Sequence, residues 1–238
     1  MARPFKIDEH SARRNEILDA ALGLVLSKGY ERMTVADISG ELGISSGAFY
    51  HYFGSKPGLL DAIVERMRAV SEPLLAAVVN DAALGAIAKL QGFLDALDAI
   101  RLERRALVVE LLRIWQSDDN AIVRARLETS TLGWRAELVT QIVRQGVAEG
   151  VFSPAHPKRC GEIVMALLQA MGNAHATEML CFGGGKTGEP EFTEAVVAIH
   201  DAYLDAVERV LAAPARSLRR TDAEAVRDWS RLLKPGRR

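Results

Sequence analysis

TVADISGELGISSGAFYHYFGSKPG, the stretch from Thr34 to Gly58, decides the fold of this chain. It predicts two short helices joined by a tight turn, followed by the start of a third helix. Thr34 is a good N-cap residue, and Asp37 falls in the first turn of the helix that it begins. Gly43 then supplies the left-handed backbone conformation that ends this helix.

The second short helix is predicted from Ser46 to about Tyr52, with Ser45 as its cap. Phe49 and Phe53 are four residues apart, so both fall on its buried side. The outer side then begins with small residues, which are thin enough to enter a groove, and continues with side chains that have polar tips. These outer residues are Ser46, Gly47, Ala48, Tyr50, His51 and Tyr52.

Two helices joined by a glycine-containing turn are typical of a helix-turn-helix, whose second helix enters the major groove of DNA. Ser45, Ser46 and the first backbone N–H groups can meet phosphates or base edges. Tyr50, Tyr52 and Lys56 can hold phosphates on either side. The alternative is a small helical domain whose aromatic residues form only a core and whose hydroxyl groups only cap helices.

The segment from about Arg14 to Leu60 closely resembles the N-terminal domain of TetR-family transcriptional regulators. Val25 departs from the family, which often has Phe there, and Pro57-Gly58 replaces its usual acidic pair. The matching residues are Arg14, Ile17, Leu18, Ala20, Ala21, Gly29, Tyr30, Thr34, Val35, Asp37, Ile38, Gly43, Ile44, Ser45, Gly47, Tyr50, Tyr52, Phe53, Ser55, Lys56, Leu59 and Leu60.

The resemblance implies that the recognition helix runs from Ser46 to Tyr52. It also implies phosphate contacts from Thr34, Tyr50 and Lys56 as well as from Tyr52. The predicted DNA-binding set is therefore Thr34, Ser45, Ser46, Gly47, Ala48, Tyr50, His51, Tyr52 and Lys56.

The charge of the chain does not by itself favour DNA binding. The net charge is −1, and the segment Met1–Lys56 has seven Lys/Arg and seven Asp/Glu. Net charge bears on solubility and steering rather than on fold. A basic face must therefore come from placement, and the residues that can form it are Arg3, Lys6, Arg13, Arg14 and Lys56.

The first helix is predicted from Asp8 to Lys28, because apolar residues from Ile17 to Val25 recur at helical spacing. Met1 to Ile7 shows no packing pattern. It is either a disordered tail or a basic arm that reaches into the minor groove.

A helix is predicted from Ser55 to about Val70, and Pro73 is expected to break or bend it near Ser71, which is taken as the domain boundary. The family resemblance implies that this helix transmits movement between two domains. The predicted division is a helix-turn-helix domain over 1–54, a connecting helix over 55–72, a helical regulatory and dimerisation domain over 73–213, and a basic C-terminal tail over 214–238.

The composition favours an all-α protein. The chain has 238 residues, of which 49% are hydrophobic and 26% charged, enough for a sizeable core. No apolar run reaches the roughly 18 residues of a membrane span, and the N-terminus lacks the apolar core of a signal peptide. Cys160 and Cys181 have no metal or redox spacing, so a reducing cytoplasmic setting is expected.

The pattern from Leu74 to Ala213 is helical throughout. The segment Cys181–Phe192 is predicted as a flexible loop, and its glycine run lacks the spacing and the preceding strand of a phosphate-binding loop. The predicted helices are Ala82–Ala99, Arg104–Gln116, Asp119–Glu149, Pro157–Leu180 and Phe192–Ala212.

The last two large helices carry apolar faces within Val164–Ala176 and Val196–Val210. These faces form either ordinary core or a four-helix bundle with a second copy, as the family resemblance implies. A dimer has a functional reason, since a two-fold pair reads half-sites about one helical turn apart.

The tail from Ala215 to Arg238 has eight Lys/Arg and three Asp/Glu. Within it, Thr221–Leu233 is predicted as an amphipathic helix capped by Thr221. This helix either docks through Trp229 onto the regulatory domain or contacts DNA or a partner.

The resemblance also implies a pocket between the middle helices. Pockets are mostly apolar with few polar groups, although each of the residues concerned can equally belong to a plain core. Arg113, Gln116 and His175 are the candidates for a polar anchor. The predicted ligand-binding residues are Phe93, Arg113, Trp115, Gln116, Trp134, Met165, His175 and Met179.

We therefore expect an all-α, homodimeric, sequence-specific transcriptional regulator that binds a palindromic double-stranded DNA operator. In this interpretation it is a repressor, released by a small-molecule effector whose identity does not follow from the sequence. The alternative is a helical DNA-binding protein without a ligand, whose second domain only dimerises or recruits a protein partner. No catalytic or metal motif occurs, so neither an enzyme nor a cofactor is expected.

Overall fold

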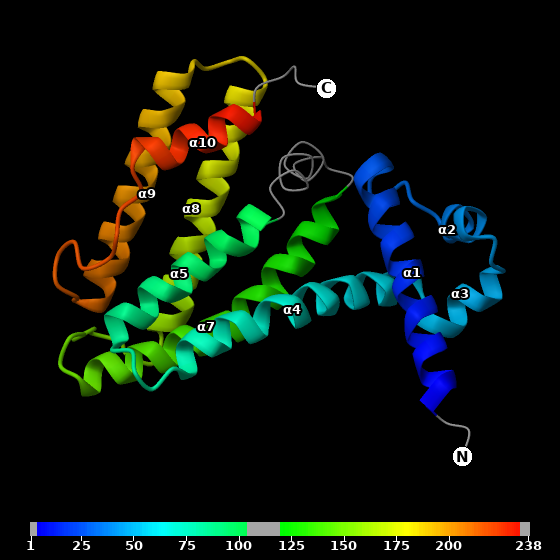
Figure 1. The fold of residues 1–238 in the computed structure, drawn as a ribbon, viewed down its shortest axis with the longest axis horizontal. Coiled ribbons are helices and arrows are strands. Elements are labelled where there is room, and N and C mark those ends of the chain that lie inside the picture. The colour runs from blue at the N-terminus through cyan, green and yellow to red at the C-terminus, as the bar shows by residue number, and fades with distance from the viewer. Residues whose placement is uncertain (1–3, 104–119, 234–238) are drawn as a thin grey trace. The chain divides into compact units, whose positions relative to one another are not determined.

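The computed structural model describes residues 4–103 and 120–233, and within these ranges every regular element is an α-helix (Figure 1). The all-α prediction is therefore confirmed. None of the described helices is both long and apolar enough to cross a membrane. The helices are α1 (Pro4–Lys28), α2 (Val35–Leu42), α3 (Ser46–Phe53), α4 (Lys56–Asn80), α5 (Ala86–Glu103), α7 (Ala121–Ala148), α8 (Cys160–Gly183), α9 (Glu189–Leu211) and α10 (Ala223–Leu233).

The described chain forms two compact units. The first contains the residues up to Val70 together with the start of α7 as far as Ser130. The second begins at Ser71 and contains the rest of α7 and all that follows it. Both α4 and α7 therefore begin in the first unit and end in the second.

The local signals read from Thr34 to Gly58 act as predicted. Thr34 and Asp37 form a capping box at the start of α2, and Gly43 ends this helix with φ 62°. Ser45 caps α3, its side chain accepting from the Ala48 N–H. The Ser55 hydroxyl accepts from the Gly58 N–H at 3.0 Å, so the first turn of α4 is capped as well.

The first unit has its own apolar core. Phe49 of α3 is fully buried, and Phe53 is 8% exposed. They pack among residues of α1 and α4 and with Val123 at the start of α7. This cluster comprises Ile17, Leu18, Ala21, Val25, Tyr30, Met33, Ile38, Phe49, Phe53, Leu59, Leu60, Ala62, Ile63, Val64 and Val123.

Helix α1 begins earlier than predicted. It starts at Pro4 rather than at Asp8, so most of the expected tail is helical. Proline is well accommodated in a first turn, where its missing N–H would have no helical acceptor. Met1 to Arg3 lie outside the described residues.

Helix α4 continues through Pro73, and the predicted end near Ser71 is wrong. Pro73 removes one backbone hydrogen bond, which normally ends or kinks a helix. Here the residues beyond it are held by packing, because Leu75 is fully buried and Val79 is 5% exposed within the core of the second unit. Tertiary burial therefore overrides the local signal.

The second unit is organised around α8 and α9, which pack against each other along their lengths. The buried residues of α8 include Val164, Met165 and Leu168, and those of α9 include Leu204 and Val207. Parts of the two apolar faces predicted for these helices are thus buried in the core of the single chain. Helices α5 and α7 complete the same core.

Several helix ends in this unit are closed by side chains from other helices. Glu149, just after α7, accepts from the Ala86 N–H at the start of α5 at 2.9 Å. Lys89 of α5 is 6% exposed, and its Nζ donates to the Val79 carbonyl oxygen in the last turn of α4 at 2.6 Å. The Gln145 amide donates to the Leu84 carbonyl oxygen at 2.9 Å.

The connection between α8 and α9 is shorter than the predicted loop Cys181–Phe192, because α8 extends to Gly183 and α9 begins at Glu189. Phe182 and Phe192 explain the difference. Both are buried, and their rings stack with centroids 4.6 Å apart. Their burial fixes both helix ends and leaves only a short turn between them.

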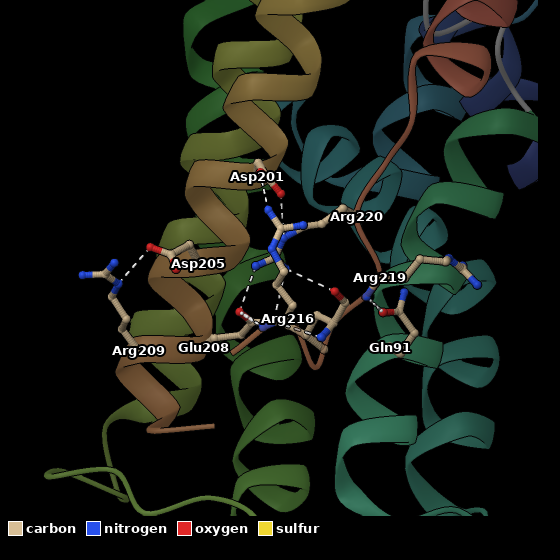
Figure 2. Close-up of polar contacts among 9 residues, drawn as sticks. Gln91, Asp201, Asp205, Glu208, Arg209, Arg216, Arg219 and Arg220 are labelled. Carbon is tan, nitrogen blue, oxygen red and sulfur yellow. Dashed lines mark hydrogen bonds and ion pairs between the residues drawn. The ribbon is translucent and has the colours of Figure 1, made fainter. Parts of the chain in front are cut away.

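The segment before α10 is tied down by a buried ion pair (Figure 2). Glu208 of α9 is 3% exposed and accepts from the Arg220 guanidinium at 2.8 Å. It also accepts from the N–H groups of Arg216 and Leu218. Arg220 Nε lies 2.8 Å from Asp201. Burial alone would raise the pKa of Glu208, but these hydrogen bonds outweigh it and hold the pKa below its ordinary value.

Helix α10 packs on α9 and α8. Its cap is Asp222, which accepts from the Ala225 N–H at 2.9 Å, and not Thr221 as predicted. Val226 and Leu233 are buried with Phe182 and Phe192. The Trp229 side chain, through which docking was expected, lies outside the described residues, as does the helix predicted over 104–116.

Candidate DNA-binding surface

Helix α3 is anchored by one face and exposed on the other. Phe49 and Phe53 point into the core, with ring centroids 5.6 Å apart. Tyr50 is 51% exposed, although it is a large aromatic residue. Ser45, Ser46, Gly47 and His51 are also exposed, and Ala48 and Tyr52 are half-buried. The structure thus places the predicted α3 residues on the outer side of one short helix.

Gly47 leaves the start of α3 unusually bare. A Cβ atom added there would meet only the Ser45 Oγ, at 3.7 Å, which is an ordinary van der Waals distance. The packing of this chain therefore does not require glycine at this position. A glycine here instead allows another molecule to approach the backbone closely.

Thr34 is exposed, but its polar atoms are already used within the capping box. Its Oγ1 lies 2.6 Å from Asp37 Oδ2, and its N–H donates to the same oxygen at 2.7 Å. Lys28 Nζ lies 2.6 Å from Asp37 as well. The Lys28 ammonium and the Thr34 hydroxyl and N–H together lower the pKa of Asp37 to about 2. The start of α2 is therefore a well-ordered edge beside the turn.

Lys56 is held at the first turn of α4. Its Nζ lies 4.4 Å from the centroid of the Tyr30 ring and donates to the Glu31 carbonyl oxygen at 3.2 Å. Tyr30 is 5% exposed, and burial raises its pKa. Tyr30 therefore packs in the core of the first unit. The Lys56 ammonium is thus placed by the turn between α1 and α2.

His10 also belongs to this surface, although no pattern in the sequence indicated it. Its ring centroid lies 4.6 Å from that of Tyr52 and 6.0 Å from that of His51. His10 is exposed and comes from α1, far from α3 in the sequence. Only the packing of α1 against α3 brings these rings together, so no local motif could have indicated it.

The predicted basic face is partly used in contacts within the chain. Arg13 pairs with Glu16, and the Arg14 guanidinium lies 5.3 Å from the Phe53 ring centroid. Lys56 lies over Tyr30, as described above. The side chains of Arg3 and Lys6 lie outside the described residues. The surface therefore owes its character to α3 and its edges more than to a large excess of positive charge.

Four of the described residues that were predicted to bind a ligand fall in two apolar clusters. Phe93 and Met165 are buried in the main core of the second unit, with Trp134 packed against it. Met179 belongs to a separate cluster around Phe182 and Phe192. The predicted residues that lie outside the described chain are Arg113, Trp115 and Gln116.

His175 has a well-defined neighbour. Its ring stacks on that of His200 of α9, with centroids 6.1 Å apart and planes 6° from parallel. Burial lowers the pKa of His200, which favours the neutral imidazole. Among the residues that the structure describes, no group of three or more His, Cys, Asp or Glu side chains is arranged to hold a metal ion.

Comparison with known proteins points to the first unit. Residues 17–63 match the family model for bacterial regulatory proteins of the tetR family. The HTH-type transcriptional repressor KstR2 of Mycobacterium tuberculosis is 28% identical over 150 residues, covering 60% of this chain and 71% of that protein. The HTH-type transcriptional regulator BetI of Burkholderia mallei is 27% identical over 206 residues, covering 84% of this chain and 95% of that protein.

Solved structures share the fold over most of the chain. The SmeT–triclosan complex aligns with a TM-score of 0.62 at 19% identity, covering 89% of this chain and 97% of SmeT. A TetR-family regulator from Pectobacterium atrosepticum aligns with a TM-score of 0.57 at 24% identity, covering 84% of this chain and 96% of that one. These two similarities extend to the helical second unit, which the family model does not cover.

Proposed function

Because this chain belongs to the TetR family and is a DNA-binding transcriptional regulator, not an enzyme, we propose that it is a repressor that binds its operator as a homodimer and is released by a small-molecule effector. The observation that carries the proposal is the orientation of α3. Its two phenylalanines are buried, and its small-residue start and polar-tipped aromatics face outward.

We assign base readout to the exposed start and middle of α3. Ser46, Gly47, Ala48 and His51 present small or hydrogen-bonding groups that suit a major groove. Thr34, Ser45, Tyr50, Tyr52 and Lys56 flank them and contact phosphates, which fix register without reading sequence.

The proposed homodimer uses the parts of α8 and α9 that are not consumed by their own pairing. Gly172 and Ala176 of α8 are only half-buried within the single chain. A second copy packed on this face would give the two recognition helices a fixed spacing. The operator would then be a palindrome with half-sites about one helical turn apart.

The proposed effector binds in the second unit. SmeT, which shares the fold, was solved in complex with triclosan, an observation that supports a sensor role for this helical architecture. In this chain the candidate contacts are Phe93, Trp134, Met165, His175 and Met179. An effector that prefers one arrangement of the dimer weakens DNA binding, and DNA weakens effector binding by the same factor. A coupling of about 1–3 kcal/mol gives a response of about 5–150-fold.

The alternative is a regulator without an effector, whose second unit only dimerises or recruits a protein. The burial of Phe93 and Met165 in the main core is the observation that favours it. A cytoplasmic location, where operator DNA is accessible, is part of both versions of the proposal.

The decisive experiment is selection of duplexes from random DNA at low ionic strength, with and without a metabolite library. We expect a palindromic consensus and at least one compound that lowers the affinity for it. A palindrome without any responsive compound would favour the alternative. Failure to enrich any duplex would refute the proposed function.

A further inference from the structure

The residue that precedes α7 lies inside the first compact unit. Asn120 is 1% exposed, and Val123, one turn further on, is buried in the same apolar cluster as Leu59. At the surface, the Arg126 guanidinium lies 2.9 Å from Asp61 of α4. The start of α7 is therefore built into the unit that carries α2 and α3.

Asn120 contacts the turn between α1 and α2. Gly29 ends α1 with φ 86°, and its N–H bonds back to the Val25 carbonyl oxygen at 3.0 Å. The next amide, that of Tyr30, instead donates to Asn120 Oδ1 at 2.8 Å. A buried N–H group needs an acceptor, and here the acceptor comes from 90 residues further along the chain.

The same turn holds Lys56. The Tyr30 ring and the Glu31 carbonyl oxygen are the two groups against which its Nζ rests, at 4.4 Å and 3.2 Å. A cation above an aromatic ring is attracted to the ring face, so the position of the ring fixes the position of the ammonium group. The turn sets where Lys56 lies, and Asn120 secures the turn.

We propose that Asn120 is a positioning residue for DNA binding, which holds Lys56 in place through the Tyr30 backbone. This inference rests on the proposed function, in which Lys56 contacts a phosphate. Helix α7 also supplies Val139 and Ile142 to the core of the second unit. A displacement of this helix would withdraw the acceptor from Tyr30, and DNA affinity would fall without any change in α3 itself.

The test is a double-mutant cycle between Asn120→Leu and Lys56→Ala. Leucine keeps the size of the side chain and removes the acceptor. Binding is measured by fluorescence anisotropy on a duplex that the wild-type protein selects from random DNA, over a range of salt concentrations. We expect Asn120→Leu to weaken binding about 10-fold and to lower the salt slope by up to about one. In the Lys56→Ala background the same change should alter affinity by less than about 2-fold.

Two further variants separate positioning from general stability. Asn120→Asp keeps an acceptor and suits the start of a helix, so it should restore most of the affinity and the salt slope. Arg126→Ala removes an exposed ion pair from the same helix and should leave both unchanged. If Asn120→Leu does not fold, Asn120→Ser, which shortens the reach of the acceptor, replaces it in the cycle.

The proposal would be overturned if Asn120→Leu lowered DNA affinity equally in the wild-type and Lys56→Ala backgrounds and left the salt slope unchanged. Asn120 would then have only a structural role. Wild-type affinity in a folded Asn120→Leu protein would also overturn the proposal. These outcomes leave the proposed function standing, because the wild-type protein still selects a duplex. If it selects none, the proposed function and the role of Asn120 fall together.

Discussion

At Gly47, folding and DNA binding should respond in opposite directions. A Cβ at this position meets only the Ser45 Oγ, at 3.7 Å, so the protein can accommodate Gly47→Ala without repacking. Alanine is favoured over glycine inside a helix by about 0.8–1.0 kcal/mol. Because Gly47 lies in the first turn of α3, we expect a smaller gain in the free energy of unfolding, of about 0.5 kcal/mol.

The same methyl group should weaken binding to DNA. If the start of α3 lies against the base edges, a carbon atom added there must displace either the helix or the contacts on either side of it. We expect the Kd for the selected duplex to rise at least about 10-fold, equivalent to about 1.4 kcal/mol. Affinity for unrelated duplexes, which depends on phosphate contacts, should change much less.

Gly40→Ala is the matched control. Gly40 lies on the exposed side of α2, and a Cβ there would meet nothing within 4 Å. This variant should gain about 1 kcal/mol, or about 2–4 °C in Tm, and should bind the selected duplex like the wild-type protein. Thermal unfolding and anisotropy titrations measure both quantities. A Gly47→Ala protein that is more stable and binds with wild-type affinity would refute the placement of α3 against the bases.

Lys56→Ala should weaken binding to all duplexes alike and lower the salt slope by about one, as measured by titrations at several salt concentrations. Glu208→Gln should destabilise the fold by about 3 kcal/mol at neutral pH, because it removes the buried carboxylate and leaves the half-buried Arg220 guanidinium paired with Asp201 alone. The pKa of Glu208 is lowered in the folded state, so its contribution to stability is present above the pKa of the unfolded state and is lost as the pH falls through the pKa of the folded state. The difference in the free energy of unfolding between wild type and variant, measured by urea unfolding, should therefore become smaller at acid pH. Phe192→Ala should cost about 3–5 kcal/mol in the same assay, and a cost below about 1 kcal/mol would contradict the described stacking on Phe182.

The parts of the fold that could be predicted from the sequence are those that depend on neighbours a few residues away. The capping box of Thr34 and Asp37, the left-handed Gly43 and the Ser45 cap all act within one helical turn. The spacing of Phe49 and Phe53 likewise specifies the buried face of α3 without knowledge of what covers it. These signals were sufficient to define the second short helix and its buried face, whereas its role as a recognition helix is what the family resemblance implies.

The parts that the sequence did not reveal depend on distant residues. Pro73 normally ends a helix, and only the burial of Leu75 and Val79 in the second unit keeps α4 continuous. The contacts of His10 with Tyr52, and of Asn120 with Tyr30, join segments whose separation in the chain gives no pattern. Residues such as His10 and Asn120 lie in no recognisable motif, so their roles cannot be predicted before the packing is known.

The side chains that close the ends of α4, α5 and α7 have a consequence for how the second unit opens. Lys89 ties α5 to the last turn of α4, and Glu149 and Gln145 tie the end of α7 to the start of α5. None of these ends can fray without uncovering a donor or acceptor on another helix. Their amide protons should therefore exchange with solvent as one group, in a shared subglobal opening and not helix by helix.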